Sequence, residues 1–353
     1  MGYKILAINP GSTSTKIAVY DDDQELFSES VLHSDDERKK YDRVTDEFDM
    51  RKDNIVRTLE SHGVNREMLS AVVGRGGQIT NIHAGGYLVT EDMKKTLTDA
   101  GTIEHASNLG AIIADAIATP LGIPAYIYDA VGSDELPPVA KITGIPEVIR
   151  HSFCHVLNSK AMARKAADRL GKTYQTANFI VAHLGGGISI SAHERGRIID
   201  VVTADGGPFS PERSGSVPLN YIVDMCFSGQ YNKKEMKKKI AGMGGMKAYL
   251  GTSSAIEIES MIKEGNTLAK KIYEAQAYQI AKGIGELSPT LKGCIDAIIM
   301  TGGVAHSRML TDMVKEYVEF IAPIFIMPGE NELESLAAGA LRILKGEEEA
   351  VPY

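Results

Sequence analysis

The sequence predicts an alternating α/β fold built from two related halves. An apolar run of strand type at residues 3–8 is joined by a polar turn to a second run at 16–20, and the same pattern returns at residues 178–183 and 188–192. In both halves, further short apolar runs alternate with segments of helical period. This alternation is typical of sheets covered by helices, and the recurrence indicates one structural unit used twice.

The first half is predicted to begin with three strands. Turn residues at 9–15 join the first two strands into a hairpin with a polar tip, and the third strand follows an acidic turn. Residues 35–66 are highly charged, so we expect a solvated helical face without a functional role. The other elements expected here are strands at 25–32, 71–73 and 125–128 and a helical period over 103–118.

The second half is predicted to be richer in helix. A helix at 155–170 precedes the strand–turn–strand unit, and a third strand follows at 197–202. At roughly 100 to 200 residues per domain, 353 residues correspond to about two domains. The remaining elements expected are helices at 218–227, 233–240, 255–263, 266–287, 306–320 and 332–344 and strands at 295–300 and 324–327.

Composition excludes several classes of protein. Lys+Arg 38 against Asp+Glu 46 gives a net charge of -8, which is the wrong sign for a protein that binds nucleic acid through its phosphates. The most apolar stretch, 109–128, contains Asp115 and two prolines, so we expect no membrane span. The three cysteines form no CxxC pair, which argues against a zinc or redox site and favours a reducing, cytoplasmic location.

Three turns rich in Gly, Ser and Thr each follow a predicted buried strand, at residues 9–15, 184–187 and 301–304. A single turn of this kind is usually ordinary hairpin geometry, because Gly and Asn supply positive φ angles. Three together, two of them in equivalent places of a repeat, favour contact with a polyphosphate, which needs many backbone and hydroxyl donors. None of the turns fits GxxxxGK[ST] or GxGxxG, so the P-loop and dinucleotide-binding folds lose support.

The three turns resemble motifs of one superfamily. NPGSTSTK at 9–16, HLGGG at 183–187 and TGGV at 301–304 resemble the phosphate-1, phosphate-2 and adenosine motifs of the acetate and sugar kinase, Hsp70 and actin superfamily. Residues 129–138, 208–215 and 328–332 resemble the acetokinase family and, within it, most closely the butyrate kinases. The resemblance covers nearly the whole chain.

This resemblance implies two duplicated actin-like ATPase domains of the ribonuclease H type around a central cleft. Domain I, on the acyl and phosphate side, would comprise residues 1–149 and the C-terminal helix at 332–353, and domain II, which binds nucleotide, residues 150–331. The resemblance also implies ATP or ADP as a substrate, Mg²⁺ as cofactor, and a homodimer or larger homo-oligomer. The implied nucleotide contacts are Asn9, Ser12, Thr13, Ser14, Lys16, His183, Gly185, Gly186, Gly187, Gly302, Gly303 and Val304.

Two arginines stand on turns beside glycine. A carboxylate is already an anion at pH 7 and needs no base before it attacks phosphorus, but it needs cations to offset charge repulsion. Arg75 lies in Gly-Arg-Gly-Gly after the strand at 71–73, and Arg213 lies in the loop 210–215. A guanidinium can bind carboxylate or phosphate through two hydrogen bonds, and both positions match active-site arginines of acetokinases. Elsewhere such arginines are usually only solvated charges.

Three histidines lie near predicted element ends. His105 and His155 stand near helix starts and His183 ends a strand, and a lone histidine there most often makes a core or capping hydrogen bond. The resemblance matches His155 to the histidine that contacts the transferring phosphoryl group and His105 to a secondary active-site histidine. For His183, in the phosphate-2 motif, a mainly structural role stays open.

Two acids are candidates for holding Mg²⁺. Asp129 ends the strand at 125–128, where a carboxylate can hold the metal directly or through water, although it also suits an ordinary turn. Glu332 begins the last predicted helix and resembles the second metal-site acid of the family, although the helix dipole also favours an acid there. Glu330 and Glu334 are close enough to leave the register open.

Two departures from acetate kinases concern the acyl group. Gly77 stands where they carry a valine, and Cys154 stands where they carry a phenylalanine. Both changes remove side-chain volume, and each buried methylene contributes about 0.8 kcal/mol. If these residues line the acyl pocket, a four-carbon acid such as butyrate or a branched short-chain acid is favoured over acetate or propionate.

Two rival functions remain at this point. A hydroxyl kinase of the sugar-kinase type would use Asp129 as a general base instead of a metal ligand. A nucleotide-driven switch or filament protein like Hsp70 or actin would assemble in response to nucleotide. The sequence favours a reversible carboxylate kinase that makes an acyl phosphate.

Overall fold

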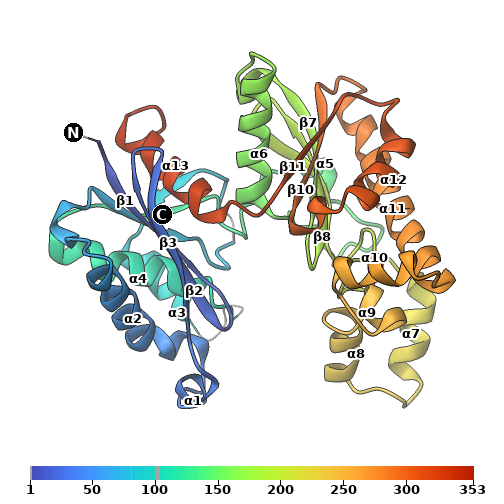
Figure 1. Ribbon diagram of the computed structural model, residues 1–353, viewed down its shortest axis with the longest axis horizontal. Coiled ribbons are helices and arrows are strands. Elements are labelled where there is room, and N and C mark those ends of the chain that lie inside the picture. Colours follow the sequence, from blue (N-terminus) through green and yellow to red (C-terminus); the bar gives the residue numbers. More distant parts are fainter. Residues whose placement is uncertain (1, 81, 100–103) are drawn as a thin grey trace. The chain divides into compact units, whose positions relative to one another are not determined.

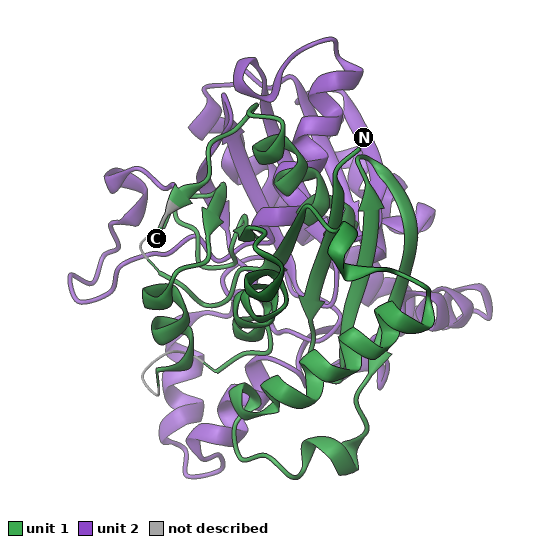
Figure 2. Cartoon of the chain, turned by 90° about the vertical axis from the view of Figure 1, so that its left-hand side faces the viewer, with its two compact units in different colours: residues 1–134, 331–353 green, residues 135–330 purple. Residues whose placement is uncertain are grey.

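The chain divides into two compact units. The structure, a computed structural model, describes residues 2–80, 82–99 and 104–353. Unit 1 comprises residues 1–134 and 331–353 and unit 2 residues 135–330, so both chain ends belong to unit 1 (Figure 2). Glu135, just after the first boundary, is held within unit 2 by Lys160 at 2.8 Å. The roles assigned to the two domains, acyl group and nucleotide, stay predictions.

Unit 1 contains a seven-stranded mixed sheet in the order β12-β5-β6-β4-β1-β2-β3. The first three strands form an antiparallel meander, while β4 is parallel to β1 and β6 is parallel to β4. The predicted hairpin is confirmed, with Pro10 opposite Thr15 at its tip. The strands are β1 (Lys4–Pro10), β2 (Ser14–Asp21), β3 (Gln24–Leu32), β4 (Ala71–Arg75), β5 (Gly86–Leu88), β6 (Ala125–Tyr128) and β12 (Val351–Pro352).

Helices pack on the sheet of unit 1 according to the two-residue period of its strands. Leu6 and Ile8 of β1 pack in one core cluster with residues of α2 and α4. The C-terminal helix α13 contacts β1, β4 and β6 of the same sheet (Figure 1). Asn9 follows Ile8 and therefore points to the opposite face of the sheet, where it contacts the start of α13. The helices are α1 (Asp35–Arg38), α2 (Phe48–Ser61), α3 (Glu91–Thr98), α4 (Asn108–Ala118) and α13 (Glu332–Leu344).

Unit 2 repeats the same strand plan in a five-stranded sheet of order β11-β10-β7-β8-β9. The meander β7-β8-β9 is antiparallel, and β10 and β11 continue it in parallel. This order corresponds strand by strand to β6-β4-β1-β2-β3 of unit 1, which confirms the predicted duplication. The strands are β7 (Asn178–Leu184), β8 (Ile188–Glu194), β9 (Arg197–Val202), β10 (Ala297–Gly302) and β11 (Ile324–Pro328).

Helices cover both faces of this second sheet (Figure 1). Phe179 and Val181 of β7 pack against α6, whereas Ile180 and Ala182 pack in the cluster with α11 and α12. In the described part of the chain, no helix combines the length and apolar character needed to cross a bilayer. The helices are α5 (Pro138–Lys141), α6 (Val156–Arg169), α7 (Leu219–Phe227), α8 (Lys233–Ile240), α9 (Gly245–Leu250), α10 (Ala255–Lys263), α11 (Thr267–Leu287) and α12 (Arg308–Val318).

One sequence prediction about unit 1 is wrong. Residues 35–66 do not form a uniformly solvated face, because Arg51, Ile55 and Leu59 of α2 are fully buried and Glu47 is nearly so. These helix positions are four residues apart and therefore lie on one face of α2. The burial of Arg51 places a cation below the turn between β1 and β2.

Candidate active site

Three polar residues lie at the carboxyl ends of neighbouring parallel strands in unit 1. The register pairs Ile8 of β1 with Gly74 of β4, and Arg75 of β4 with Tyr128 of β6. Asn9, Arg75 and Asp129 therefore end adjacent strands at the same edge of the sheet. In open α/β sheets this edge is where ligands bind.

Arg75 joins two other predicted residues in one cluster. Its Nη1 donates to Asn9 Oδ1 at 3.3 Å and also to Glu332 Oε1, while Asn9 Nδ2 donates to Glu332 Oε2. Glu332 is the first residue of α13 and follows Asn331, whose φ is +47°. Of the three acids whose register the sequence left open, Glu332 is the one in contact with Arg75.

The guanidinium of Arg75 has a buried donor without a partner in the part of the chain that the structure describes. Within the described residues, its Nε is buried and has no hydrogen-bond partner. An unmet buried donor costs about 1 to 3 kcal/mol, which an acceptor oxygen in contact with it would recover. An acceptor oxygen placed at Nε would therefore meet a donor that the described residues leave unpaired.

Asp129 is held in an unusual backbone conformation. Its φ is +43°, a region that few residues other than glycine adopt. Two hydrogen bonds to Gly85 fix it there: Asp129 N donates to Gly85 O at 3.0 Å, and Gly85 N donates to Asp129 Oδ1 at 2.9 Å. Strained conformations of this kind gather at functional sites.

The two acids at this edge of the sheet carry the type of oxygen ligand that Mg²⁺ takes. Mg²⁺ typically takes one or two carboxylates and keeps waters and phosphate oxygens as its other ligands. Asp129 and Glu332 are acids of that kind. Among the described residues, no group of three or more His, Cys, Asp and Glu side chains could form an all-protein metal site.

His105 lies beside the arginine cluster. Its Nδ1 accepts a hydrogen bond from Ser107 N at 3.2 Å, so the neutral ring carries its proton on Nε2. Burial and the charge of Arg75 lower the pKa of His105. The ring is therefore a neutral donor at pH 7.

The predicted phosphate-1 residues surround the turn between β1 and β2. Ser12 and Thr13 are exposed, and Lys16 stands directly opposite Asn9 in the β1–β2 register. Below the turn, Arg51 donates to the carbonyl oxygens of Gly11 and Ser12. Sequence reasoning missed Arg51, and its only local signal is the four-residue spacing with Ile55 and Leu59.

In unit 2, His183 ends β7 and is fixed by a residue that the sequence did not single out. His183 Nδ1 lies 2.9 Å from Asn158 Oδ1, which also accepts from Thr301 Oγ1 at 3.2 Å. Because Asn158 Oδ1 can only accept, His183 is protonated on Nδ1, and its Nε2 faces the Gly185 turn. Asn158 Nδ2 in turn donates to Gly329 O at 3.3 Å.

His155, at the start of α6, stacks on His183 with ring centroids 3.8 Å apart and planes 11° from parallel. Its Nδ1 lies 2.7 Å from Ser189 Oγ, which also accepts from His155 N at 3.3 Å. The structure therefore brings both predicted histidines of unit 2 together. Ser189, on β8, is a further residue that the sequence analysis missed.

Arg213 lies against the glycine turn of unit 2. A Cβ atom placed on Gly187 would stand 3.1 Å from Arg213 Nε, and Arg213 Nη1 pairs with Asp205 at 3.0 Å. Ser210 Oγ donates to Gly186 O at 2.6 Å, which ties the loop of Arg213 to the turn. Asp205 and Ser210 were not predicted.

The predicted adenosine motif begins where β10 ends. Gly302 has a φ of +88°, and a Cβ there would overlap the backbone of Leu184. Gly303 has no atom within 4 Å of its Cβ position, so open space adjoins it. Val304 follows in the short 3₁₀ helix Gly303–His306. The motif thus combines a tightly packed glycine with an accessible one.

The family model described as the acetokinase family matches residues 4–324 of the chain. The chain belongs to the acetokinase family. It is therefore a phosphotransferase with a carboxyl group as acceptor.

Solved structures of two kinases show the same fold at low identity. Acetate kinase from Porphyromonas gingivalis is 20% identical with a TM-score of 0.78, covering 97% of this chain and 100% of that chain. Propionate kinase from Francisella tularensis subsp. tularensis SCHU S4 is 21% identical with a TM-score of 0.74, covering 96% and 98%. These matches establish the two-domain, actin-like α/β fold.

Gly77, predicted to line the acyl pocket, is closely packed against two other residues. A Cβ on Gly77 would stand 2.6 Å from Leu97 Cδ2 and 2.8 Å from Asn108 Cα. Leu97 and Asn108 therefore fill the space that the missing side chain leaves, and Gly77 gives no support for a wider pocket. Cys154 is buried, and its Sγ lies 3.9 Å from Ser152 Oγ.

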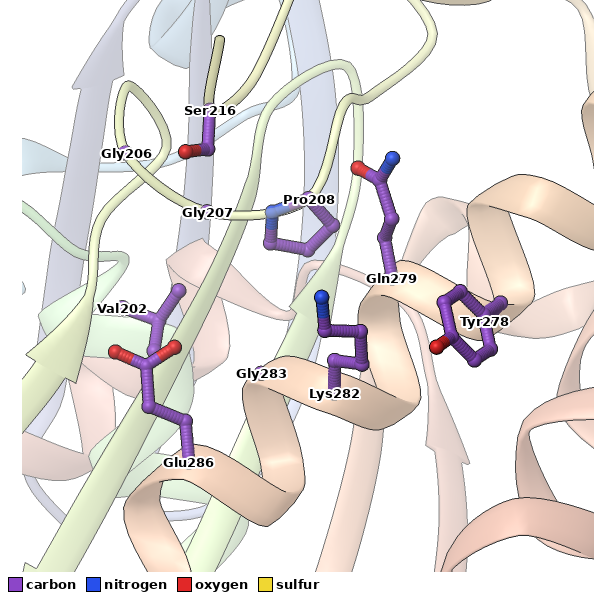
Figure 3. A pocket seen from close by; sticks show the side chains of 10 residues that line it. All are labelled: Val202, Gly206, Gly207, Pro208, Ser216, Tyr278, Gln279, Lys282, Gly283 and Glu286. Atoms are coloured by element: carbon purple, nitrogen blue, oxygen red, sulfur yellow. The ribbon is translucent and has the colours of Figure 1, made fainter. Parts of the chain in front are cut away.

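A pocket of about 270 Å³ opens between α11 and the loop after β9 (Figure 3). Tyr278, Gln279, Lys282 and Glu286 project from α11. None of its lining residues is a predicted site residue of this acetokinase, so we do not assign the reaction to it. The rest of its wall is formed by Val202, Gly206, Gly207, Pro208, Ser216 and Gly283.

Proposed function

We propose that this acetokinase transfers a phosphoryl group reversibly between ATP and butyrate, or a branched short-chain acid, to give the acyl phosphate and ADP. The observation that carries the proposal is the cluster of Arg75, Asn9 and Glu332 at the carboxyl ends of the strands, with the unmet Arg75 Nε donor. An acid kinase needs such a cation, since its two reactants are both anions.

The reaction requires no general base. A carboxylate oxygen of the acid attacks the γ-phosphorus, the bond between that phosphorus and the bridging oxygen of ADP breaks, and the electron pair leaves with ADP. Arg75 and Arg213 would each hold oxygens of the carboxylate or the phosphoryl group through the guanidinium fork. The neutral His105 and the stacked His155 would donate hydrogen bonds to phosphoryl oxygens without transferring a proton.

Mg²⁺ would spread the negative charge of the phosphates when bound, and Asp129 and Glu332 would hold it. Asp129→Asn should raise the Mg²⁺ concentration needed for half-maximal rate and lower the rate in both directions. A hydroxyl kinase with Asp129 as its base would instead keep its Mg²⁺ dependence. An unchanged Mg²⁺ titration would count against the metal role.

The preference for a four-carbon acid rests on Cys154 and on the resemblance of residues 129–138, 208–215 and 328–332 to butyrate kinases. A phenylalanine at position 154 should exclude the longer acid by overlap and affect acetate less. We expect Cys154→Phe to shift the ratio of kcat/KM for butyrate over acetate at least tenfold toward acetate. A ratio equal to that of the parent would remove Cys154 from the acyl site.

The deciding experiment traps the acyl phosphate with hydroxylamine. The full chain with ATP and Mg²⁺ would be given acetate, propionate, butyrate, isobutyrate and valerate in turn, and kcat/KM measured from the acyl hydroxamate formed. The proposal expects the highest value for butyrate or isobutyrate. A highest value for acetate would overturn the substrate assignment alone, and no hydroxamate with any acid would overturn the kinase assignment itself.

A further inference from the structure

We propose that Arg51 positions the phosphate-binding turn between β1 and β2, residues 11–14, by turning its backbone N–H groups toward the nucleotide. The inference rests on the proposed function, since it names the residue that shapes the site for the phosphates of ATP. Arg51 is a positioning residue in this account, because it acts through the turn and does not itself contact the phosphate.

Arg51 reaches the turn from α2 with its guanidinium entirely buried. Nη1 donates to Gly11 O at 2.8 Å, and Nη2 donates to Ser12 O at 3.1 Å. Nη1 also lies 3.3 Å from Thr15 Oγ1. Thr15 follows the turn on β2, and its side chain is buried. One guanidinium therefore holds two successive carbonyl groups of the turn from below.

The geometry of the peptide bond turns this contact into an orientation of donors. Within a planar trans peptide, the C=O and the N–H of the next residue point in opposite directions. When the carbonyls of Gly11 and Ser12 point at Arg51, the N–H groups of Ser12 and Thr13 must point away from it. In the described residues neither N–H donates a hydrogen bond, and both residues are exposed.

Two successive N–H groups that point outward form a concave anion site of the kind that binds phosphate. The hydroxyl groups of Ser12 and Thr13 stand on the same exposed turn, and Lys16 lies directly opposite Asn9 in the adjoining strand pair. The ligand class that fits these donors is the polyphosphate of a nucleotide.

Glu47 removes the alternative that Arg51 binds phosphate directly. Its carboxylate lies 2.7 Å from Arg51 Nε and 2.6 Å from Nη2, and it is itself buried. The pair is locally neutral, and with its bonds to Gly11 and Ser12 the guanidinium has its donors directed into the protein. A neutral buried pair shapes the turn but adds little attraction for an anion.

A second chain of hydrogen bonds, from Asn54 through His33, holds Thr15 where β2 leaves the turn. Asn54 Nδ2 donates to His33 Nδ1 at 3.3 Å, so the neutral ring carries its proton on Nε2, which donates to Thr15 Oγ1 at 2.9 Å. Burial and the charge of Arg51 lower the pKa of His33 to about 4, so this ring is neutral at pH 7. Arg51 and His33 thus converge on Thr15.

The test compares nucleotide binding in variants of the full chain. Arg51→Met combined with Glu47→Leu removes both buried charges and so avoids leaving one unpaired. Leu59→Ala is the matched control, because Leu59 is buried on the same helix but packs in the core cluster two turns away. Urea unfolding verifies that each variant is folded, and calorimetry measures the Kd of a non-hydrolysable ATP analogue with Mg²⁺ and the Kd of adenosine.

We expect the double variant to raise the Kd of the ATP analogue at least tenfold and to leave that of adenosine within twofold, while Leu59→Ala changes neither beyond twofold. The KM for ATP should rise with the Kd, whereas a loss of folded enzyme would lower only kcat. If the double variant does not fold, Arg51→Lys replaces it; lysine keeps the charge but not the planar fork, and should raise the Kd at least fivefold.

An analogue Kd within twofold of the parent in the variant tested would overturn the inference, and so would an equal rise for adenosine. Failure of the proposed function has a different signature: the parent chain itself would then bind no ATP analogue and form no acyl hydroxamate. A parent that binds and reacts, with variants that bind equally well, contradicts the role of Arg51 alone.

Discussion

The two units hold their equivalent hairpin turns in place with different interactions. In unit 1, β1 and β2 are joined by a turn that carries Ser12 and Thr13 and is held from below by Arg51. In unit 2, β7 and β8 are joined by Gly185, Gly186 and Gly187, held by one hydroxyl of Ser210. The first turn carries hydroxyl side chains and is oriented by a buried ion pair, whereas the second consists of three glycines and has no side chains.

This difference indicates that duplication preserved the strand order but not the internal support. A turn with hydroxyl side chains offers more donors to phosphate but has to be fixed in one backbone conformation. A turn of three glycines lets a ligand approach the backbone closely and leaves room for the Arg213 side chain against Gly187. Breaking each support should therefore give a different kind of failure.

The largest stability effect is expected at the buried ion pair of unit 1. Arg51→Met alone leaves the Glu47 carboxylate buried without its partner, and breaking such a pair costs about 3 to 5 kcal/mol of unfolding free energy. Arg51→Met with Glu47→Leu should cost less than the single change, because no charge is then left unpaired. Urea unfolding measures both, and a double variant less stable than the single one would contradict this account.

The next effect concerns one arginine from each unit. Arg75→Ala and Arg213→Ala should each lower kcat by about 100-fold to 1,000-fold, the size expected when one donor to a developing charge is lost. Lysine should not restore either rate, since it lacks the planar fork. Arg308→Ala is the control, because the Arg308 side chain is 92% exposed. A near-normal rate for either alanine variant would remove that arginine from the mechanism.

Much of the fold follows from local pattern. The predicted limits of α8, α10 and α13 coincide with the structure, and the strand–turn–strand units appear where apolar runs flank turn residues. The strands missed are β5 and β12, which have only three and two residues. The helices missed are α3, the four-residue α5, and α9, whose start at Gly245 follows other glycines. Short strands and glycine-rich helix starts give too weak a periodic signal.

The supporting residues of the site could not be predicted in the same way. A charged residue in a charged segment normally indicates solvent, and the i,i+4 spacing of Glu47 and Arg51 is equally common on exposed helices. Asn158 contacts Gly329, 171 positions away, so no local pattern reveals its partner. Gly77 was interpreted as missing volume, but only the packing shows that Leu97 and Asn108 occupy it.

The support of the first turn should also respond to acid. With a pKa of about 4 when folded against an ordinary 6.5, His33 favours the folded state in its neutral form. Its contribution is therefore present above pH 6.5 and is lost as the pH falls from 6.5 toward 4, on the order of 3 kcal/mol in total. Urea unfolding of the parent and of His33→Gln at pH 7.5 and 4.5 tests this. Between pH 7.5 and 4.5 the unfolding free energy of the parent should fall by more than that of His33→Gln. Parallel pH profiles would exclude His33 as the cause.

The smallest effect distinguishes two neighbouring glycines at the end of β10 in unit 2. Gly302 has a φ of +88° and packs against the backbone of Leu184, so an alanine there is strained twice, by conformation and by overlap. We expect Gly302→Ala to lower the unfolding free energy by about 1 to 3 kcal/mol. Gly303→Ala is its matched control one residue away, with no atom within 4 Å of the new Cβ, and should stay within about 0.5 kcal/mol of the parent.

Together these two variants test whether the glycines of unit 2 serve the fold or the ligand. If Gly303→Ala keeps its stability yet raises the KM for ATP, the open space beside Gly303 is used by the nucleotide, and the added methyl group obstructs it. If Gly302→Ala is as stable as the parent, backbone packing against Leu184 does not fix the turn. The contrast with the ion-paired turn of unit 1 would then lose its physical basis, because unit 2 would have no demonstrated dependence on glycine.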